Sequence, residues 1–172
     1  VIFSPVQLLF INLLTDSLPS IAVGVEPKNE DILDEKPRDP NEAILTKRFS
    51  TKLMIEGILI AIFIIIAFYI GLKDSALKGS TMAFATLCLA RLFHGIDYRG
   101  QRNVFAIGFF KNKFSLIAFT IGFALLNLIL LIPSVYKMFG ITKLEPINFV
   151  QIYILSLIPT ILIQIYKVIK YR

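Results

Sequence analysis

Residues 6–26 read VQLLFINLLTDSLPSIAVGVE, an apolar stretch that is long enough to cross a bilayer. Three oxygen-bearing side chains, those of Asn12, Thr15 and Asp16, interrupt its middle. Residues that are three and four positions apart share one face of a helix, so these side chains converge on a single stripe. An ionisable residue inside a membrane span costs about 2.5–3.5 kcal/mol on insertion scales, and the default interpretation is therefore that Asp16 has a function.

Pro19 stands four residues after Thr15. A proline has no N–H to donate to the Thr15 carbonyl, and its ring crowds that carbonyl. We expect the helix to kink or unwind there and to leave a backbone oxygen beside the side-chain oxygens. Hard cations prefer such sets of carboxylate, amide, hydroxyl and carbonyl oxygens, and broken helices form the ion sites of many transporters. The alternative is that Asp16 is a structural carboxylate, paired with a basic residue of a neighbouring helix.

The composition is that of a membrane protein. Of the 172 residues, 56% are hydrophobic, and the mean hydropathy is +0.73. The hydrophobic share exceeds that of an ordinary soluble domain. We therefore predict that residues 1–172 form one all-α domain, a polytopic membrane helix bundle with five transmembrane helices in the lipid bilayer. The predicted spans cover about residues 6–25, 53–72, 80–97, 114–133 and 148–166.

The basic residues indicate an orientation rather than a nucleic-acid surface. The net charge is +6, but the Lys and Arg residues, apart from Arg91 within a span, lie between the predicted spans and at the C-terminal end. Thirteen of them fall on one side of the membrane and four on the other. By the positive-inside rule, the N-terminus is outside and the C-terminus is cytoplasmic. Cys88 is the only cysteine, which excludes an intrachain disulfide and a cysteine metal cluster.

The first span and the loop after it resemble a known family. QLLFINLLTDSLP and AVGVEP, at residues 7–19 and 22–27, look like the sixth transmembrane helix of P-type calcium ATPases of the bacterial type. DILD and KPRDP, at residues 31–34 and 36–40, resemble the cytosolic loop that follows that helix. The order of the other four spans matches helices seven to ten. The resemblance covers the whole chain, and after about residue 100 it is mainly topological.

The resemblance implies a role for the polar stripe. In the calcium pumps, the residues that match Asn12, Thr15 and Asp16 bind the transported ion, so these three are expected to be calcium ligands here. The family's other ligands lie on the fourth and fifth helices, which this chain lacks. The aspartyl-phosphate motif, the nucleotide domain and the actuator domain are also absent. The implied partners are the missing N-terminal helices and cytosolic domains of the same pump.

The implied protein is a calcium exporter of the plasma membrane. Mg-ATP would bind to the full-length parent and not to this part, which is not expected to hydrolyse ATP alone. An emptied ion site would favour a protonated Asp16, because a carboxylate is unstable in a low-dielectric region. Calcium binding would expel that proton, so we expect proton countertransport.

Arg91 departs from the pattern of the family. In members that carry two calcium ions, the eighth helix supplies a glutamate, and that position falls on Arg91. A guanidinium stays charged and cannot bind calcium, but it can occupy the space of the missing ion and pair with Asp16. We therefore expect one calcium per cycle, with Arg91 and Pro19 modulating the site. The alternative is that Arg91 snorkels or makes a structural ion pair.

Other functions stay open from the residues alone. The chain could belong to a sodium or proton pump of the same class, to an independent channel or ion-coupled carrier, or to a structural membrane subunit. His94 could relay protons or bind a metal, although no second His or Cys lies nearby in the sequence. For Glu56 we favour a structural role, in which it reaches lipid headgroups or Lys52 four residues earlier.

Overall fold

The computed structural model describes residues 2–25, 45–97 and 112–170. Helices make up the regular structure of these residues. In chain order they are α1 (Pro5–Phe10), the π-helix η1 (Ile11–Asp16), α2 (Ser17–Gly24), α3 (Lys47–Leu72), α4 (Ala76–Asp97), α6 (Lys113–Leu131), the 3₁₀-helix η3 (Pro133–Val135), α7 (Tyr136–Phe139) and α8 (Pro146–Lys170).

The predicted all-helical membrane bundle is confirmed. Each of the five predicted spans coincides largely with a helical segment. Three helices, α3, α6 and α8, are long and apolar enough to cross a membrane. The first segment, α1–η1–α2, and α4 carry more polar residues, so their two crossings remain predictions.

Side-chain caps determine where two of the long helices begin. The Thr46 hydroxyl accepts a hydrogen bond from the Phe49 N–H at 3.2 Å and caps α3. The Asn112 side-chain oxygen accepts from the Ser115 N–H at 2.9 Å and caps α6. Such caps satisfy N–H groups that have no partner within the helix. Because Thr46 provides one, α3 begins six residues before the predicted span.

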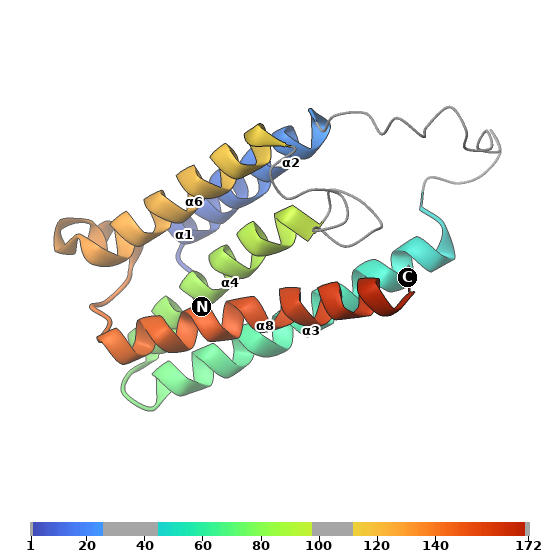
Figure 1. Cartoon of the computed structure of the whole chain (residues 1–172). Coiled ribbons are helices and arrows are strands. Elements are labelled where there is room, and N and C mark those ends of the chain that lie inside the picture. The colour runs from blue at the N-terminus through green and yellow to red at the C-terminus, as the bar shows by residue number, and fades with distance from the viewer. Residues whose placement is uncertain (1, 26–44, 98–111, 171–172) are drawn as a thin grey trace.

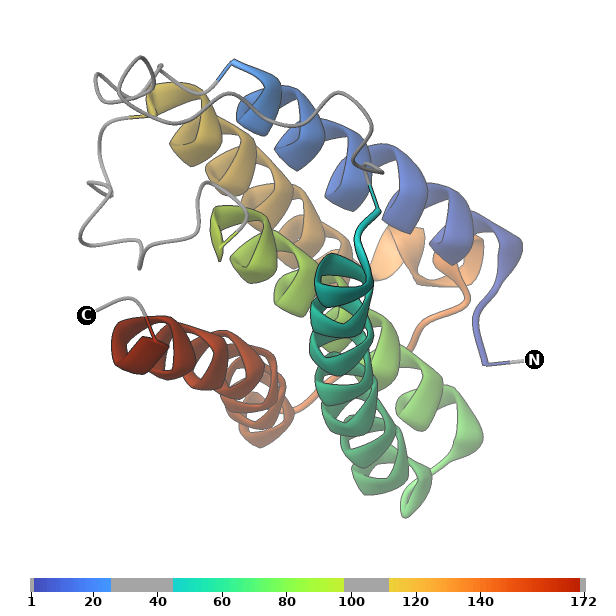
Figure 2. The same ribbon diagram turned by 90° about the vertical axis from the view of Figure 1, so that its right-hand side faces the viewer.

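Helix α4 lies at the centre of the bundle. Figures 1 and 2 show it between the α2–α6 pair and the α3–α8 pair, and it packs against all four helices. Met82, Phe84, Cys88 and Leu89 of α4 are fully buried. Because α4 lies between the two pairs, it determines how the first helical segment is placed relative to α3 and α8.

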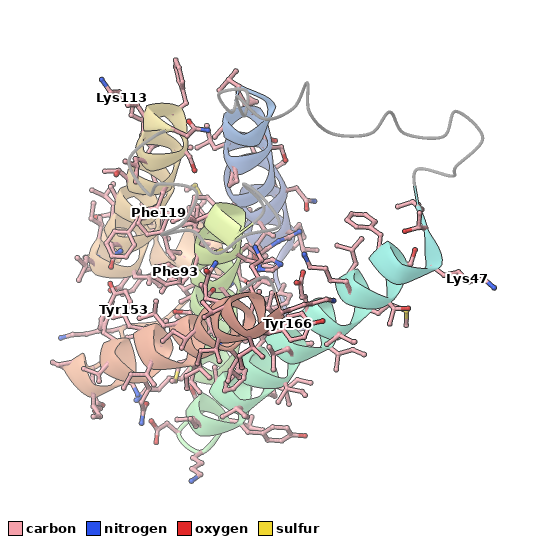
Figure 3. All side chains as sticks on the ribbon, turned by 45° about the vertical axis from the view of Figure 1, so that its right-hand side comes forward. Lys47, Phe93, Lys113, Phe119, Tyr153 and Tyr166 are labelled. Atoms are coloured by element: carbon pink, nitrogen blue, oxygen red, sulfur yellow. The ribbon has the colours of Figure 1, made fainter. Side chains whose placement is uncertain are left out.

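Close helix contacts and an aromatic row hold the neighbours of α4. A Cβ added to Gly71 of α3 would lie 2.8 Å from backbone atoms of Gly79 in α4, so only glycine fits this crossing. The aromatic row consists of stacked or tilted rings of α4, α6 and α8, three of which are labelled in Figure 3; its members are Phe93, Phe119, Phe123 and Tyr153. Centroid separations within the row are 5.4–6.0 Å, in the range of favourable ring pairs.

Lys78, near the start of α4, joins the α3–α4 turn to the segment before α8. Its Nζ atom lies 2.5 Å from Asp74 Oδ2 and 3.5 Å from Glu145 Oε1. The hydrogen bond to Asp74 raises the pKa of Lys78, and the charge of Glu145 adds to this effect. The ammonium group therefore stays charged although the residue is largely buried.

The outer surface of α3 is apolar. Five isoleucines are exposed along its length: Ile55, Ile58, Ile62, Ile65 and Ile66. A soluble protein rarely exposes so large an apolar face. Contact with lipid accounts for this surface.

Candidate cation site

The first helical segment is continuous but not uniform. Ser4 caps it, since its hydroxyl accepts from the Gln7 N–H and the Gln7 side chain accepts from the Ser4 N–H. From Ile11 to Asp16 the helix is a π-helix, and it returns to the α form at Ser17. The backbone stays in the right-handed helical region at Phe10 and at Ser17, on both sides of this turn.

The π-helical turn contains all three residues of the predicted ligand stripe. A π-helix bonds each N–H to the carbonyl five residues back, and such turns are frequent at functional sites. The expected kink or unwinding at Pro19 takes a different form. The chain remains helical through Pro19, and the irregular turn lies just before it. Pro19 has no N–H for the Thr15 carbonyl, so a regular α pattern cannot be completed there.

The structure describes one of the three predicted ligand side chains. Asn12 is exposed, and its backbone carbonyl accepts a hydrogen bond from the Ser17 hydroxyl at 3.3 Å. The side chains of Thr15 and Asp16 lie outside the described part of the structure. Among the described residues, no three His, Cys, Asp or Glu side chains come together as a metal site. The stripe therefore remains a prediction, now placed on a π-helical backbone.

Pro19 and Arg91 line the same cavity. This cavity, of about 650 Å³, lies between α2, α3 and α4. Arg91 is half-buried on α4, and His94 and Gly95 line the cavity one turn further along the same helix. The two residues predicted to modulate the site are thus brought together, although they are 72 positions apart in the sequence.

Gly95 is the close contact between α4 and the first segment. A Cβ added to Gly95 would lie only 2.9 Å from Cβ of Pro19. The absence of a side chain at Gly95 therefore allows α4 to approach the proline ring. Sequence reasoning missed this residue, because a single glycine in an apolar helix has no partner that the sequence can identify.

Hydrogen bonds fasten both ends of the first segment. At its start, the Ser4 hydroxyl donates to the Phe139 carbonyl at 2.9 Å, and the Gln7 amide donates to the Gly140 carbonyl at 3.3 Å. At its end, the buried Asn112 amide donates to the Ala22 carbonyl at 2.8 Å. The π-helical turn lies between these two attachments.

Glu56 and His94 form a second polar cluster. The predicted contact of Glu56 with Lys52 is confirmed, with 3.8 Å between Lys52 Nζ and Glu56 Oε1. His94 also reaches this carboxylate, with 3.5 Å between Nε2 and Oε2. The sequence alone does not predict this pair, because nothing in it pairs residues of different helices.

Comparison with known proteins identifies the family. Residues 1–169 match the family described as cation transporting ATPase, C-terminus. The chain belongs to this family. The π-helical turn and the cavity at Pro19 therefore lie in the C-terminal region of a cation-transporting ATPase.

Three bacterial relatives of this C-terminal region are calcium-transporting ATPases. The chain is 41% identical to calcium-transporting ATPase 1 of Lactococcus lactis over 81% of its length. It is 32% identical to the calcium-transporting ATPase of Bacillus subtilis over 92%, and 30% identical to calcium-transporting ATPase 1 of Bacillus cereus over 96%. It spans 16%, 18% and 21% of these three relatives, respectively.

Proposed function

We propose that this chain is the membrane part of an ATP-driven pump that exports calcium, and that its first segment supplies Asn12, Thr15 and Asp16 as ligands. The observation that carries the proposal is the π-helical turn Ile11–Asp16, which contains all three residues in a member of a cation pump family. The names of the bacterial relatives support calcium as the transported ion.

The chemistry of the turn suits a hard cation. Calcium takes six to eight oxygen ligands, and carboxylate, amide and hydroxyl groups are all represented in the stripe. The Thr15 carbonyl is a further candidate ligand, because Pro19 cannot donate to it. The remaining ligands and the sites of ATP chemistry would come from the preceding helices and cytosolic domains of the full-length pump.

Arg91 limits the site to one calcium ion in this proposal. Its position on the wall of the cavity that Pro19 also lines supports a role beside the first segment. A fixed guanidinium there would replace a second cation and reduce the number of ions carried per cycle. When calcium leaves, Asp16 would take up a proton, and the pump would return protons in exchange for calcium.

The orientation follows from the basic residues. The C-terminus is cytoplasmic, the N-terminus is outside, and the pump resides in the plasma membrane. The excess of Lys and Arg in the segments between the first and second and between the third and fourth predicted spans supports this orientation.

Substitution of the stripe in the full-length pump tests the ligand assignment. Calcium uptake is measured in inside-out vesicles at a series of calcium concentrations. We expect Asp16→Asn to abolish uptake and Thr15→Val to raise the calcium concentration for half-maximal uptake. Thr120→Val is the matched control, since Thr120 is a membrane threonine of α6 that bonds its own helix. Wild-type uptake by the Asp16→Asn pump would refute the assignment.

Two further measurements test the ion and the stoichiometry. Competition by sodium would indicate a pump for another ion. Uptake without ATP would indicate an ion-coupled carrier or channel. Replacing Arg91 by Glu should raise the calcium-to-ATP ratio from one toward two. An unchanged ratio and an unchanged affinity would remove Arg91 from the mechanism.

A further inference from the structure

The Glu56–His94 pair is a buried titratable pair outside the predicted ligand stripe. The side chain of Glu56 on α3 is 8% exposed, and that of His94 on α4 is 9% exposed. Lys52 approaches Oε1 of the carboxylate, so that Oε2 is left facing the imidazole. The pair joins α3 to α4 through two groups that can each hold a proton.

The surrounding charges are basic. Lys52 lies on the same helix as Glu56, and the charge of Lys167 on α8 also acts on the carboxylate. Lys167 is buried, with 2% of its surface exposed. On α4, Arg91 lies one turn before His94 and lines the same cavity. Glu56 is thus the acidic group of a cluster in which α3, α4 and α8 each supply a basic side chain.

Within this cluster the Glu56 carboxylate favours a proton on His94, whereas the neighbouring basic groups oppose it. A charged imidazolium donates to the carboxylate and forms an ion pair, whereas a neutral imidazole leaves the buried carboxylate with a weaker partner. Histidine is the side chain whose charge ordinarily changes between about pH 5 and 8. The attraction between α3 and α4 at this point should therefore depend on pH in that range.

The pair is directly connected to the first segment. His94 precedes Gly95, the residue that contacts the Pro19 ring, and all three line the cavity between α2, α3 and α4. A shift of α4 at His94 must therefore change the distance between α4 and Pro19. Pro19 in turn follows the π-helical turn by three residues.

We propose that Glu56 and His94 form a proton-binding site, separate from the cation ligands, whose occupancy sets how α4 packs against Pro19. With the proton bound, the ion pair holds α3 and α4 together. Without the proton, the contact between α3 and α4 loosens. Its effect on ion affinity rests on the proposed function, whereas its effect on stability does not.

A double-mutant cycle in the full-length pump tests this site. Glu56→Gln, His94→Gln and the double variant are compared with the wild type by thermal unfolding in detergent at pH 6 and pH 8. Tyr153→Phe is the control, because it removes another interhelical hydrogen bond, that to Asn127, without a titration in this range. At pH 6 the double variant should lose no more stability than either single variant, and this non-additivity should disappear at pH 8. The loss from Tyr153→Phe should be equal at both pH values.

Calcium activation of the same variants gives the second readout. The wild-type concentration for half-maximal activation should change between pH 6 and 8, and this change should be reduced in Glu56→Gln and in His94→Gln alike. Additive losses of stability at both pH values would overturn the proton site. A pH-dependent cycle in a protein that does not transport calcium would support the proton site and refute only the calcium function.

Discussion

Replacement of Gly95 by alanine tests whether the contact of α4 with Pro19 controls the first segment. The added methyl would lie 2.9 Å from Cβ of Pro19, whereas carbon atoms pack best at about 3.5–4.0 Å. Because a proline ring cannot rotate away, α4 and α2 must separate by about 0.6–1.1 Å. Such overpacking costs about 1–3 kcal/mol. The higher helix propensity of alanine offsets about 1 kcal/mol of this, which leaves a net loss of about 0–2 kcal/mol.

Thermal unfolding and calcium activation of the full-length pump measure the result. We expect Gly95→Ala to lower the midpoint of unfolding. If about 1 kcal/mol of the strain falls on the ion-bound state, the calcium concentration for half-maximal activation rises about fivefold. Gly24→Ala is the control, because no atom lies within 4 Å of a Cβ added there. Equal behaviour of the two variants would refute the role of the Gly95–Pro19 contact.

Two other substitutions test the attachments of the bundle. Asn112→Ala should destabilise the protein by about 2–3 kcal/mol in unfolding experiments, because it removes the cap of α6 and leaves the buried Ala22 carbonyl without its donor; Asn112→Asp keeps the cap and should lose less, and equal losses would assign the whole effect to the lost hydrogen bond with Ala22. The raised pKa of Lys78 contributes stability that is fully present below its ordinary pKa of 10.5 and is lost as the pH rises through the higher pKa of the folded state. Lys78→Gln should therefore flatten the alkaline part of the profile of unfolding midpoint against pH, whereas Lys73→Gln, at an exposed neighbouring position, should leave the profile of the wild type.

The helices were predictable because their signal is local. An uninterrupted apolar run determines a membrane helix by length alone, and α6 and α8 begin within two residues of the predicted spans. Helix α3 begins earlier than the apolar run predicts, since the cap at Thr46 extends the helix through Lys47, Thr51 and other polar residues that an apolar run excludes. Caps of this kind depend on backbone conformation, which hydropathy does not report.

The polar stripe can be identified from the sequence, but the shape of its backbone cannot. The stripe of Asn12, Thr15 and Asp16 can be read from helical spacing, and Pro19 marks an irregular turn. The form of that turn, a π-helix before the proline, depends on how η1 and α2 pack against α4 and α6. The pairing of Glu56 with His94 likewise depends on the crossing of α3 and α4, and a single sequence does not predict how two helices cross.

The first helical segment is anchored at both ends by hydrogen bonds to other parts of the bundle. Ser4 and Gln7 bond one end to the turn after α7, and Asn112, at the start of α6, bonds the other end. Neither end can move without breaking these hydrogen bonds, so the distance between the two attachments is fixed. In the proposed pump, any lengthening or twisting that ion binding requires would then be confined to the π-helical turn between these attachments, which contains the predicted ligands.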